Sequence, residues 1–339
     1  MTALSSNNIA TALTPCLEIT VSEDSAPLDA HQPLLTHLYF GDNNHPNTNC
    51  LSIQTSIEVL GSNLFAQYWF TDQKIQQAKY KNVHYAFNQQ ILFGHIQLRY
   101  SNEDDFQQLT EQTYQEVFEC LKNTGCTHLL RTWNFFPEIT KITATHQQIN
   151  RYELFCSGRL HALHASGIDH KIYPAATVIG NQSDCLQIYF LACDTPGIAV
   201  ENPRQTSAYD YPVTDALMRP LFSRGVLKVW GNRTHFYVSG TASIVGHETL
   251  HINDVSAQLN EAINNIETLV AHANDQHQTQ LNAQDDLLYM KVYIRHRNDV
   301  PHIKQVLAAR LSSTTPRILL LGDMCRDDLL VEIEAFYQA

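Results

Sequence analysis

The segment Gly322–Ala335, GDMCRDDLLVEIEA, decides the fold, because its end matches a segment in the first half of the chain. "VEIEA", residues 331–335, has its counterpart in "LQIYF", residues 186–190, 145 residues earlier. A second pair of segments, "LFGH" around Gly94 and "VSGT" around Gly240, lies 146 residues apart. Two anchors with nearly one offset indicate an internal repeat of domain size.

The second half predicts the order strand, strand, helix, strand, helix, strand, strand. Residues 226–245 are rich in Val, Thr, Tyr and Phe around a Gly231–Asn232 turn, which predicts two strands. Apolar residues at helical spacing follow the cap candidates Asn253 and Asp254, so we expect an amphipathic helix over 255–270. In "LLYMKVYIRH", residues 287–296, apolar residues alternate with tyrosines and cations, which predicts a strand with one polar face.

The first half repeats this order. We therefore expect an α+β protein with two copies of one domain, each a mixed or antiparallel sheet with helices on one face. The segment between the copies is rich in proline and polar residues and too long for a plain linker, as segments that line a site often are. The expected divisions are a flexible N-terminus at 1–30, a first domain at 31–200, a connecting segment at 201–225 and a second domain at 226–339.

The composition limits the classes of function. A chain of 339 residues with 44% hydrophobic residues can bury a sizeable core, and its net charge of −12 argues against nucleic-acid and membrane partners. The N-terminus lacks a basic, apolar leader, and no segment resembles a membrane span. The eight cysteines show no paired spacing, which indicates reduced thiols in a cytoplasmic protein.

Glu332 and Glu334 share one face of the last strand, because side chains alternate with period two. The first copy has Gln187 and Tyr189 at these positions, so the carboxylates belong to one copy alone. Functional specialisation of a duplicated domain would produce this difference. Periodicity by itself favours another interpretation, in which both glutamates face solvent on a half-exposed strand.

Two sets of motifs resemble known families. The C-terminal half, with "VSGTAS", "MKVYIRH" and "PRILLLGDMCRDDLLVEIEA", resembles the RidA-like (YjgF-like) superfamily. The blocks "RTWNFFPEI", "NRYELFCSGR", "YPAATVIG", "NPRQTSAYDYP", "SGTASIVGHET" and "GDMCRDDLLVEIE", in this order, resemble the chorismatases. The resemblance implies two RidA-like (chorismate-mutase-like) domains packed as a pseudo-oligomer, with the site between them and mainly on the second.

The resemblance also implies an activity, the cleavage of chorismate with release of pyruvate. The proton-donating glutamate of the family falls on Glu332, with Glu334 as its neighbour. Members that form 3-hydroxybenzoate carry the cysteine and glycine found here as Cys325 and Gly240, so this product is expected, in secondary metabolism. Hydrolysis to a dihydroxycyclohexadiene acid, or mixed 3- and 4-hydroxybenzoate formation, stays open. Cys325 would assist aromatisation, although from its residue type alone it is a buried structural thiol.

A dianionic substrate needs cations, and arginine binds carboxylates in bidentate geometry. Arg204 and Arg295 are the first candidates within the family blocks, followed by Arg151 and Arg159. Each has an alternative as a surface charge or a structural ion pair. The tyrosines of "NPRQTSAYDYP", Tyr209 and Tyr211, are further candidates for substrate binding.

Other functions have weaker signals. His161 and His164 stand three apart on a helix but lack a further ligand at metal spacing, and the chain has no phosphate-binding glycine loop, so we expect neither metal nor cofactor. Arg317 occupies the position of the substrate arginine of imine-hydrolysing RidA proteins, which keeps that activity as a rival. A ligand-binding module is the non-enzymatic alternative. The expected partner is a small molecule, bound by a monomer.

Overall fold

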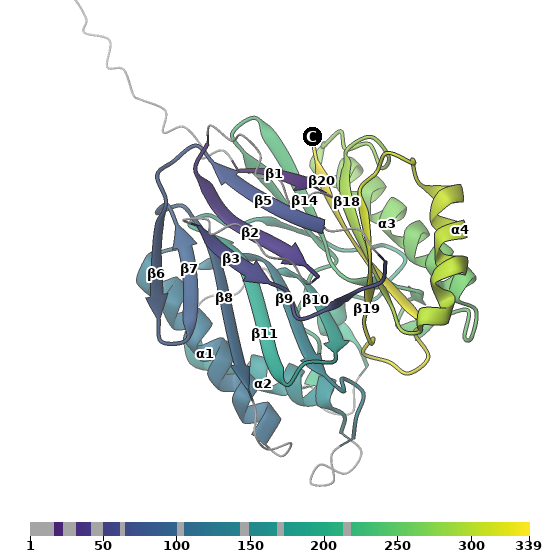
Figure 1. Ribbon diagram of the computed structural model, residues 1–339, viewed down its shortest axis with the longest axis horizontal. Coiled ribbons are helices and arrows are strands. Elements are labelled where there is room, and N and C mark those ends of the chain that lie inside the picture. The colour runs from purple at the N-terminus through teal and green to yellow at the C-terminus, as the bar shows by residue number, and fades with distance from the viewer. Residues whose placement is uncertain are drawn as a thin grey trace, which may run out of the picture.

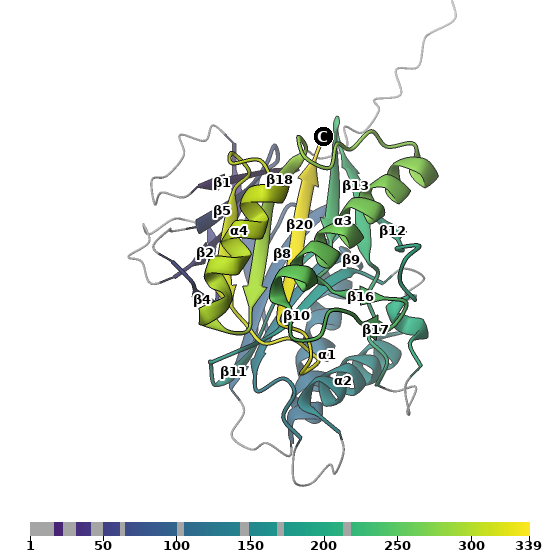
Figure 2. The same ribbon diagram turned by 90° about the vertical axis from the view of Figure 1, so that its right-hand side faces the viewer.

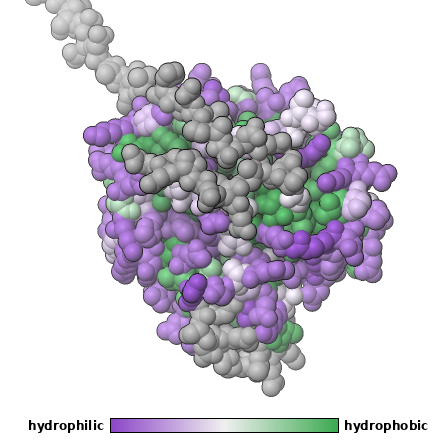
Figure 3. Space-filling model, viewed as in Figure 1, coloured by the Kyte–Doolittle hydropathy of each residue, from purple (hydrophilic) through white to green (hydrophobic). Residues whose placement is uncertain are grey.

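The structure is a computed structural model with two domains and an additional N-terminal sheet around a shared core (Figure 1). Among the residues it describes, no helix combines the length and apolarity that crossing a membrane requires. Hydrophilic residues cover most of the described surface seen in Figure 3. The described residues are 17–22, 32–41, 50–61, 65–99, 105–142, 149–167, 173–212 and 218–339.

The first domain is a six-stranded sheet in the order β10-β9-β11-β8-β7-β6, with two helices on one face (Figure 1). Helix α2, Arg151–Ser166, begins at a capping box in which Asn150 and Glu153 each accept the other's backbone N–H. Helix α1, Phe106–Thr124, ends at Gly125 in the left-handed conformation. The strands are β6 (Gln76–Tyr80), β7 (Val83–Phe87), β8 (Ile91–Arg99), β9 (His128–Pro137), β10 (Ala175–Asn181) and β11 (Cys185–Cys193).

The second domain has the order β12-β13-β14-β20-β18-β19-β4, with β15 also paired to β20. Helix α3, Val255–His277, begins where the Asp254 side chain accepts the N–H of Ala257, as its cap position predicts. Figure 2 shows α3 beside α4, Val300–Arg310, over this sheet. The strands are β4 (Glu58–Val59), β12 (Ile198–Val200), β13 (Gly225–Trp230), β14 (Arg233–Val238), β15 (Thr241–Ala242), β18 (Leu287–Ile294), β19 (Arg317–Leu321) and β20 (Val331–Gln338), besides the small β16–β17 hairpin (Ile244–Val245, Glu248–Thr249).

The internal repeat is confirmed by topology and register. The order β10-β9-β11-β8-β7 recurs as β19-β18-β20-β14-β13. Gln187 lies opposite Gln97, and Glu332 lies opposite Ala242, so both members of the pair recur 145 residues on. The glycine anchor is wrong: Gly94 lies within the continuous β8 ladder, whereas Gly240 lies in the break between β14 and β15.

A four-stranded sheet of order β1-β5-β2-β3 was not predicted from the sequence. Its first strand lies within the segment expected to be a flexible N-terminus, so that expectation is wrong for Leu17–Ser22, where Leu17 and Ile19 are buried and the strand pairs with β5. The rest of the predicted segment, 1–16 and 23–30, lies outside the described residues. The strands are β1 (Leu17–Ser22), β2 (Leu34–Phe40), β3 (Leu51–Gln54) and β5 (Phe65–Thr71).

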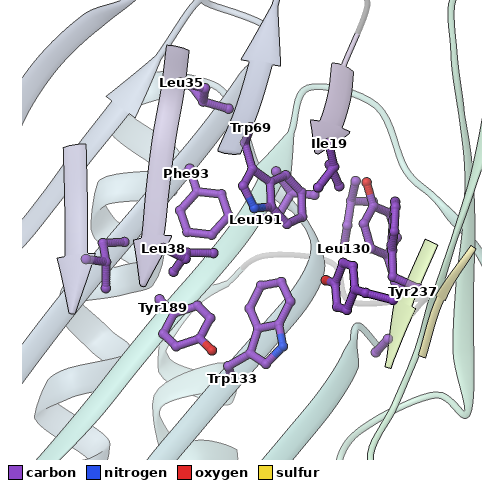
Figure 4. Packing of buried hydrophobic residues seen from close by; sticks show 14 of the residues in the cluster. Ile19, Leu35, Leu38, Trp69, Phe93, Leu130, Trp133, Tyr189, Leu191 and Tyr237 are labelled. Carbon is purple, nitrogen blue, oxygen red and sulfur yellow. The ribbon is translucent and has the colours of Figure 1, made fainter. Parts of the chain in front are cut away.

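The three sheets turn their inner faces toward one aromatic core. Figure 4 shows Trp69 of β5 near Phe93 of β8 and Trp133 of β9, and Tyr189 of β11 stacks on Trp133 with ring centroids 4.8 Å apart. The inner face of the second domain's sheet is therefore covered by protein. Solvent-facing glutamates on β20 are excluded, because Glu332 and Glu334 are 7% and 2% exposed.

Candidate active site

A cavity of about 230 Å³ lies between the two domains. The start of α2 and the strand β10 line it from the first domain, and β15, the β19–β20 loop and β20 line it from the second. The connecting segment contributes Tyr211 and residues from Met218 to Arg224. Three predicted site residues of the second domain, Glu332, Cys325 and Gly240, line this one cavity.

Gly240 makes room for the Glu332 carboxyl. A Cβ atom at position 240 would overlap the Glu332 Oε1 oxygen and lie 2.9 Å from its Cδ. The backbone of Gly240 is fixed because its N–H donates to the Ala176 carbonyl of β10 at 3.0 Å. The break between β14 and β15 therefore leaves room for the Glu332 carboxyl of β20 to lie against the first domain.

Glu332 is a protonated acid at neutral pH. Burial raises its pKa, the negative charge of Glu334 raises it further, and together they outweigh Arg131 and Arg224 to give a pKa of about 8. The group is thus buried, lines the cavity and can donate a proton. These are the physical requirements for a general acid near neutral pH.

Glu334 is ionised, and it does not line this cavity. Burial alone would raise its pKa, but Lys291, Arg131 and hydrogen bonds outweigh that effect and hold the pKa at about 2. Its carboxylate accepts from Arg131 Nη2 at 2.9 Å, Trp133 Nε1 at 2.9 Å, Thr177 Oγ1 at 2.7 Å and Tyr293 OH at 3.0 Å, and pairs with Lys291 Nζ at 2.8 Å.

Cys325 is a neutral thiol. Burial raises its pKa to about 12, with a contribution from the nearby Glu332. The thiol lines the cavity together with Tyr152 of α2 and Leu329. It is therefore available to a bound molecule as a weak hydrogen-bond donor, and a thiolate nucleophile is excluded at neutral pH.

The four arginines predicted to bind substrate do not line the cavity. Arg204 pairs with Glu261 and donates to Asn265 of α3, which ties the connecting segment to that helix. Arg295 pairs with Asp323 and donates to three carbonyls of the β19–β20 loop. On α2, Arg151 donates to Pro137 O and to Glu138, and Arg159 packs against Phe155 beside a separate cavity of about 20 Å³. Each thus has a structural place in this conformation.

Two other arginines line the cavity, and the sequence analysis missed both. Arg224 is 4% exposed and donates through Nη2 to Tyr211 OH at 2.7 Å, and within the described part of the chain its Nε has no hydrogen-bond partner. Arg326 lies 5.6 Å from the Tyr211 ring and donates to His247 O. Arg326 directly follows Cys325 in the quoted block, a signal that pointed to it, whereas Arg224 stands outside every block.

The remaining candidates are placed as follows. The Tyr211 ring lies 5.6 Å from each of the two guanidinium groups, whereas Tyr209 packs against Tyr173 with ring centroids 5.3 Å apart and does not line the cavity. His161 lies 3.5 Å from Glu111. Within the described part of the chain, no three His, Cys, Asp or Glu residues gather as metal ligands would.

Comparisons with known proteins identify the family of this chain. The family described as Chorismatase FkbO/Hyg5-like, N-terminal, matches residues 67–192. A 3-hydroxybenzoate synthase from Streptomyces hygroscopicus is 32% identical over 277 residues, which cover 80% of each chain. The chain belongs to the chorismatase family. A second chorismatase, from Streptomyces rapamycinicus, is 34% identical over 278 residues, 80% of this chain and 81% of the relative.

The fold agrees along nearly the whole length. A crystal structure of a chorismatase matches 96% of this chain and 99% of its own with a TM-score of 0.84, at 28% sequence identity. The N-terminal sheet and both repeated domains therefore belong to the chorismatase fold. The match covers both domains between which the cavity lies.

Proposed function

We propose that this chorismatase cleaves chorismate to 3-hydroxybenzoate and pyruvate. The observation that supports it most is a protonated, buried carboxyl, Glu332, in a small cavity that also contains two arginines and a thiol. Relatives named 3-hydroxybenzoate synthase and chorismatase at 32–34% identity support the same substrate and reaction.

The reaction begins with proton transfer from Glu332 to the terminal methylene of the enol ether, which becomes the methyl group of pyruvate. The ring hydroxyl then attacks the neighbouring ring carbon, the carbon–oxygen bond to pyruvate breaks, and the hydroxyl proton passes to the Glu332 carboxylate. The arene-oxide-like product isomerises to the phenol: one of its carbon–oxygen bonds opens, a ring carbon loses its proton, and the oxygen gains one. One proton is given and one recovered, and water is neither consumed nor formed.

Arg224 and Arg326 are proposed to bind the substrate carboxylates. Arg224 presents a buried guanidinium whose Nε has no hydrogen-bond partner among the described residues, and Arg326, like Arg224, lies 5.6 Å from the Tyr211 ring. Charge-assisted hydrogen bonds from these groups would orient the dianion with its methylene toward Glu332. They take the role that the sequence analysis gave to Arg204 and Arg295.

Cys325 and Gly240 are proposed to select the product. The neutral Cys325 thiol would lie beside the ring during aromatisation, and Gly240 keeps the Glu332 carboxyl in the cavity wall. Hydrolysis to the dihydroxycyclohexadiene acid requires a water molecule in place of the ring hydroxyl as nucleophile. A side chain that shapes the space beside the ring can decide between these two nucleophiles.

The deciding experiment incubates the purified protein with chorismate. Pyruvate is measured with a coupled dehydrogenase, and the ring product is identified by chromatography. Equal amounts of pyruvate and 3-hydroxybenzoate are expected. A dihydroxycyclohexadiene acid would contradict the product assignment, and turnover of 2-iminopropionate without turnover of chorismate would favour imine hydrolysis.

The proposed setting is a cytoplasmic monomer. Seven described cysteines are free thiols, as a reducing compartment would keep them. The two domains and the N-terminal sheet already cover one another's inner faces, which is the role that neighbouring subunits play in an oligomer. Sedimentation analysis that gives a dimer or trimer would contradict the monomer.

A further inference from the structure

Glu334 is fixed in a fully buried shell of donors that comes from both domains. Arg131 and Trp133 lie on β9, Thr177 lies on β10, and Lys291 and Tyr293 lie on β18. All five side chains are at most 2% exposed. These five donors surround the Glu334 carboxylate and separate it from the cavity. Glu334 therefore cannot itself transfer a proton to a ligand there.

This shell lies directly beneath Glu332. Glu332 and Glu334 project from the same face of β20, and their cross-strand neighbours on β18 are Tyr293 and Lys291. Thr177 connects the two positions, because its Oγ1 donates to Glu334 and lies 3.5 Å from the Cβ position of Gly240, against which the Glu332 carboxyl is seated. The two carboxyls therefore lie side by side in one buried environment of low dielectric constant.

From this geometry we infer that Glu334 is a positioning residue, a fixed negative charge anchored by Lys291 and Arg131 that keeps the Glu332 carboxyl protonated for proton transfer. The inference rests on the proposed function of Glu332 as general acid. It extends that function to residues that never touch the substrate, including Lys291 of the polar strand face and Arg131 of the other domain.

The other groups facing Glu332 act in known directions. Arg131 from β9 and Arg224 from the connecting segment favour ionisation of Glu332, and burial and Glu334 oppose it. Arg326 and the neutral thiol Cys325 face it from the β19–β20 loop, and Tyr152 faces it from α2. A dianion bound to Arg224 and Arg326 would neutralise two of these cations. The effect of Arg224 on Glu332 is then removed, so substrate binding favours the protonated acid.

The test is the pH dependence of kcat in Glu334→Gln. Because Glu332 must be protonated, kcat of the wild type falls as pH rises through its pKa. Removal of the negative charge at 334 lowers that pKa, so the alkaline limb of the profile should move to lower pH by about one unit or more. Glu334→Asp keeps the charge and should return the limb toward its original position.

Tyr293→Phe is the matched control, because it removes one neutral donor to Glu334 and leaves the charge. Its alkaline limb should stay with the wild type. If Glu334→Gln fails to fold because Lys291 loses its partner, Lys291→Met/Glu334→Gln removes the pair together and should shift the limb in the same direction by a smaller amount, because the positive charge of Lys291 is removed as well. A folded Glu334→Gln protein, or a folded double variant, whose limb coincides with the wild type would overturn the inference.

An infrared titration separates failure of this inference from failure of the proposed function. The carboxylic acid band that is lost in Glu332→Gln reports protonation of Glu332 without any turnover. In wild type the band should persist at neutral pH, and in Glu334→Gln it should disappear at lower pH. A protein that shows these titrations but does not cleave chorismate would contradict the proposed function and leave the role of Glu334 supported. An unchanged titration in Glu334→Gln would contradict that role even in an active enzyme.

Discussion

The two domains fill equivalent cross-strand positions with opposite chemistry. In the first domain Trp133 lies opposite Tyr189, and Phe135 lies opposite Gln187. In the second domain the corresponding pairs are Lys291 with Glu334 and Tyr293 with Glu332. The aromatic pair and the charged pair meet across the domain interface, where Lys291 Nζ lies 5.2 Å from the Trp133 ring and Trp133 Nε1 donates to Glu334.

This difference shows how one duplicated scaffold divides its work. The second domain supplies the two carboxyls, and the first supplies Arg131 and a wall that removes water from them, so both shift the carboxyl pKa values. Gln187, the counterpart of Glu332, instead joins the N-terminal sheet to the first domain: its Oε1 accepts from Ser56 N–H at 2.8 Å, and its Nε2 donates to Gln54 O at 2.9 Å.

The largest loss of activity is expected at Glu332, where the second domain has a carboxyl and the first domain has the amide of Gln187. Glu332→Gln keeps the shape of the side chain and removes the acidic proton, so kcat should fall by about 10²- to 10⁴-fold. Substrate binding should persist, because the arginines are unchanged. Stopped pyruvate assays and equilibrium binding of chorismate measure the two effects. Retained turnover would show that another group donates the proton.

A smaller loss is expected on the cationic side of the cavity. Arg224→Gln removes a charged donor worth about 1.5–3 kcal/mol, so kcat/KM should fall by roughly 10- to 100-fold. The matched control is Arg204→Gln, which removes an arginine that pairs with Glu261 away from the cavity. If Arg204→Gln lowers kcat/KM as much as Arg224→Gln does, the assignment of the substrate cations is wrong.

Gln187→Glu tests whether a carboxyl at the equivalent position of the first domain is enough to create a second active site. The side chain is 1% exposed and its amide donor bonds the Gln54 carbonyl, so a carboxylate there would face an acceptor. The free energy of unfolding should drop by about 1–3 kcal/mol. Burial raises the pKa of the new carboxyl, so the loss should be full at pH 8 and shrink as pH falls and the group is protonated.

Denaturant unfolding at pH 5 and pH 8 measures this effect, with the exposed Gln182→Glu as control. The comparison also predicts that the rate of pyruvate release at saturating chorismate stays that of the wild type. A second, independent chorismate-cleaving activity in Gln187→Glu/Glu332→Gln would show that the first domain holds a complete site.

Local signals in the sequence predicted the elements well. The Asp254 cap marks the start of α3, and alternation marks β18 and β20. The likeness of the two sheets also follows from the repeat once "VEIEA" and "LQIYF" are paired, and the pairs Gln97–Gln187 and Ala242–Glu332 keep that offset. These features depend on neighbours in the sequence or on a comparison within it.

Tertiary features escaped the sequence analysis for a physical reason. Alternation shows that Lys291 and Glu334 lie on one polar face, but burial of that face depends on another domain. Likewise, Arg204 and Arg224 stand in the same connecting segment, and only the fold shows that the first pairs with Glu261 of α3 whereas the second lines the cavity. Residue type identifies a cation, whereas its partner is set by packing.

The smallest effect on the rate of pyruvate release is expected at Cys325, which lines the cavity from the second domain. Its thiol is neutral and does not donate the first proton, so Cys325→Ala should retain most pyruvate release. The ring product should change, because the space and the weak donor beside the ring are lost and water can replace the ring hydroxyl as nucleophile. Chromatography of the ring products, compared with the amount of pyruvate formed, measures the change, with the buried Cys120→Ala as matched control. If Cys325→Ala yields 3-hydroxybenzoate in the wild-type proportion, the choice of product depends on Gly240, which leaves space for the Glu332 carboxyl. The Cys325 thiol is then a packing residue of the second domain.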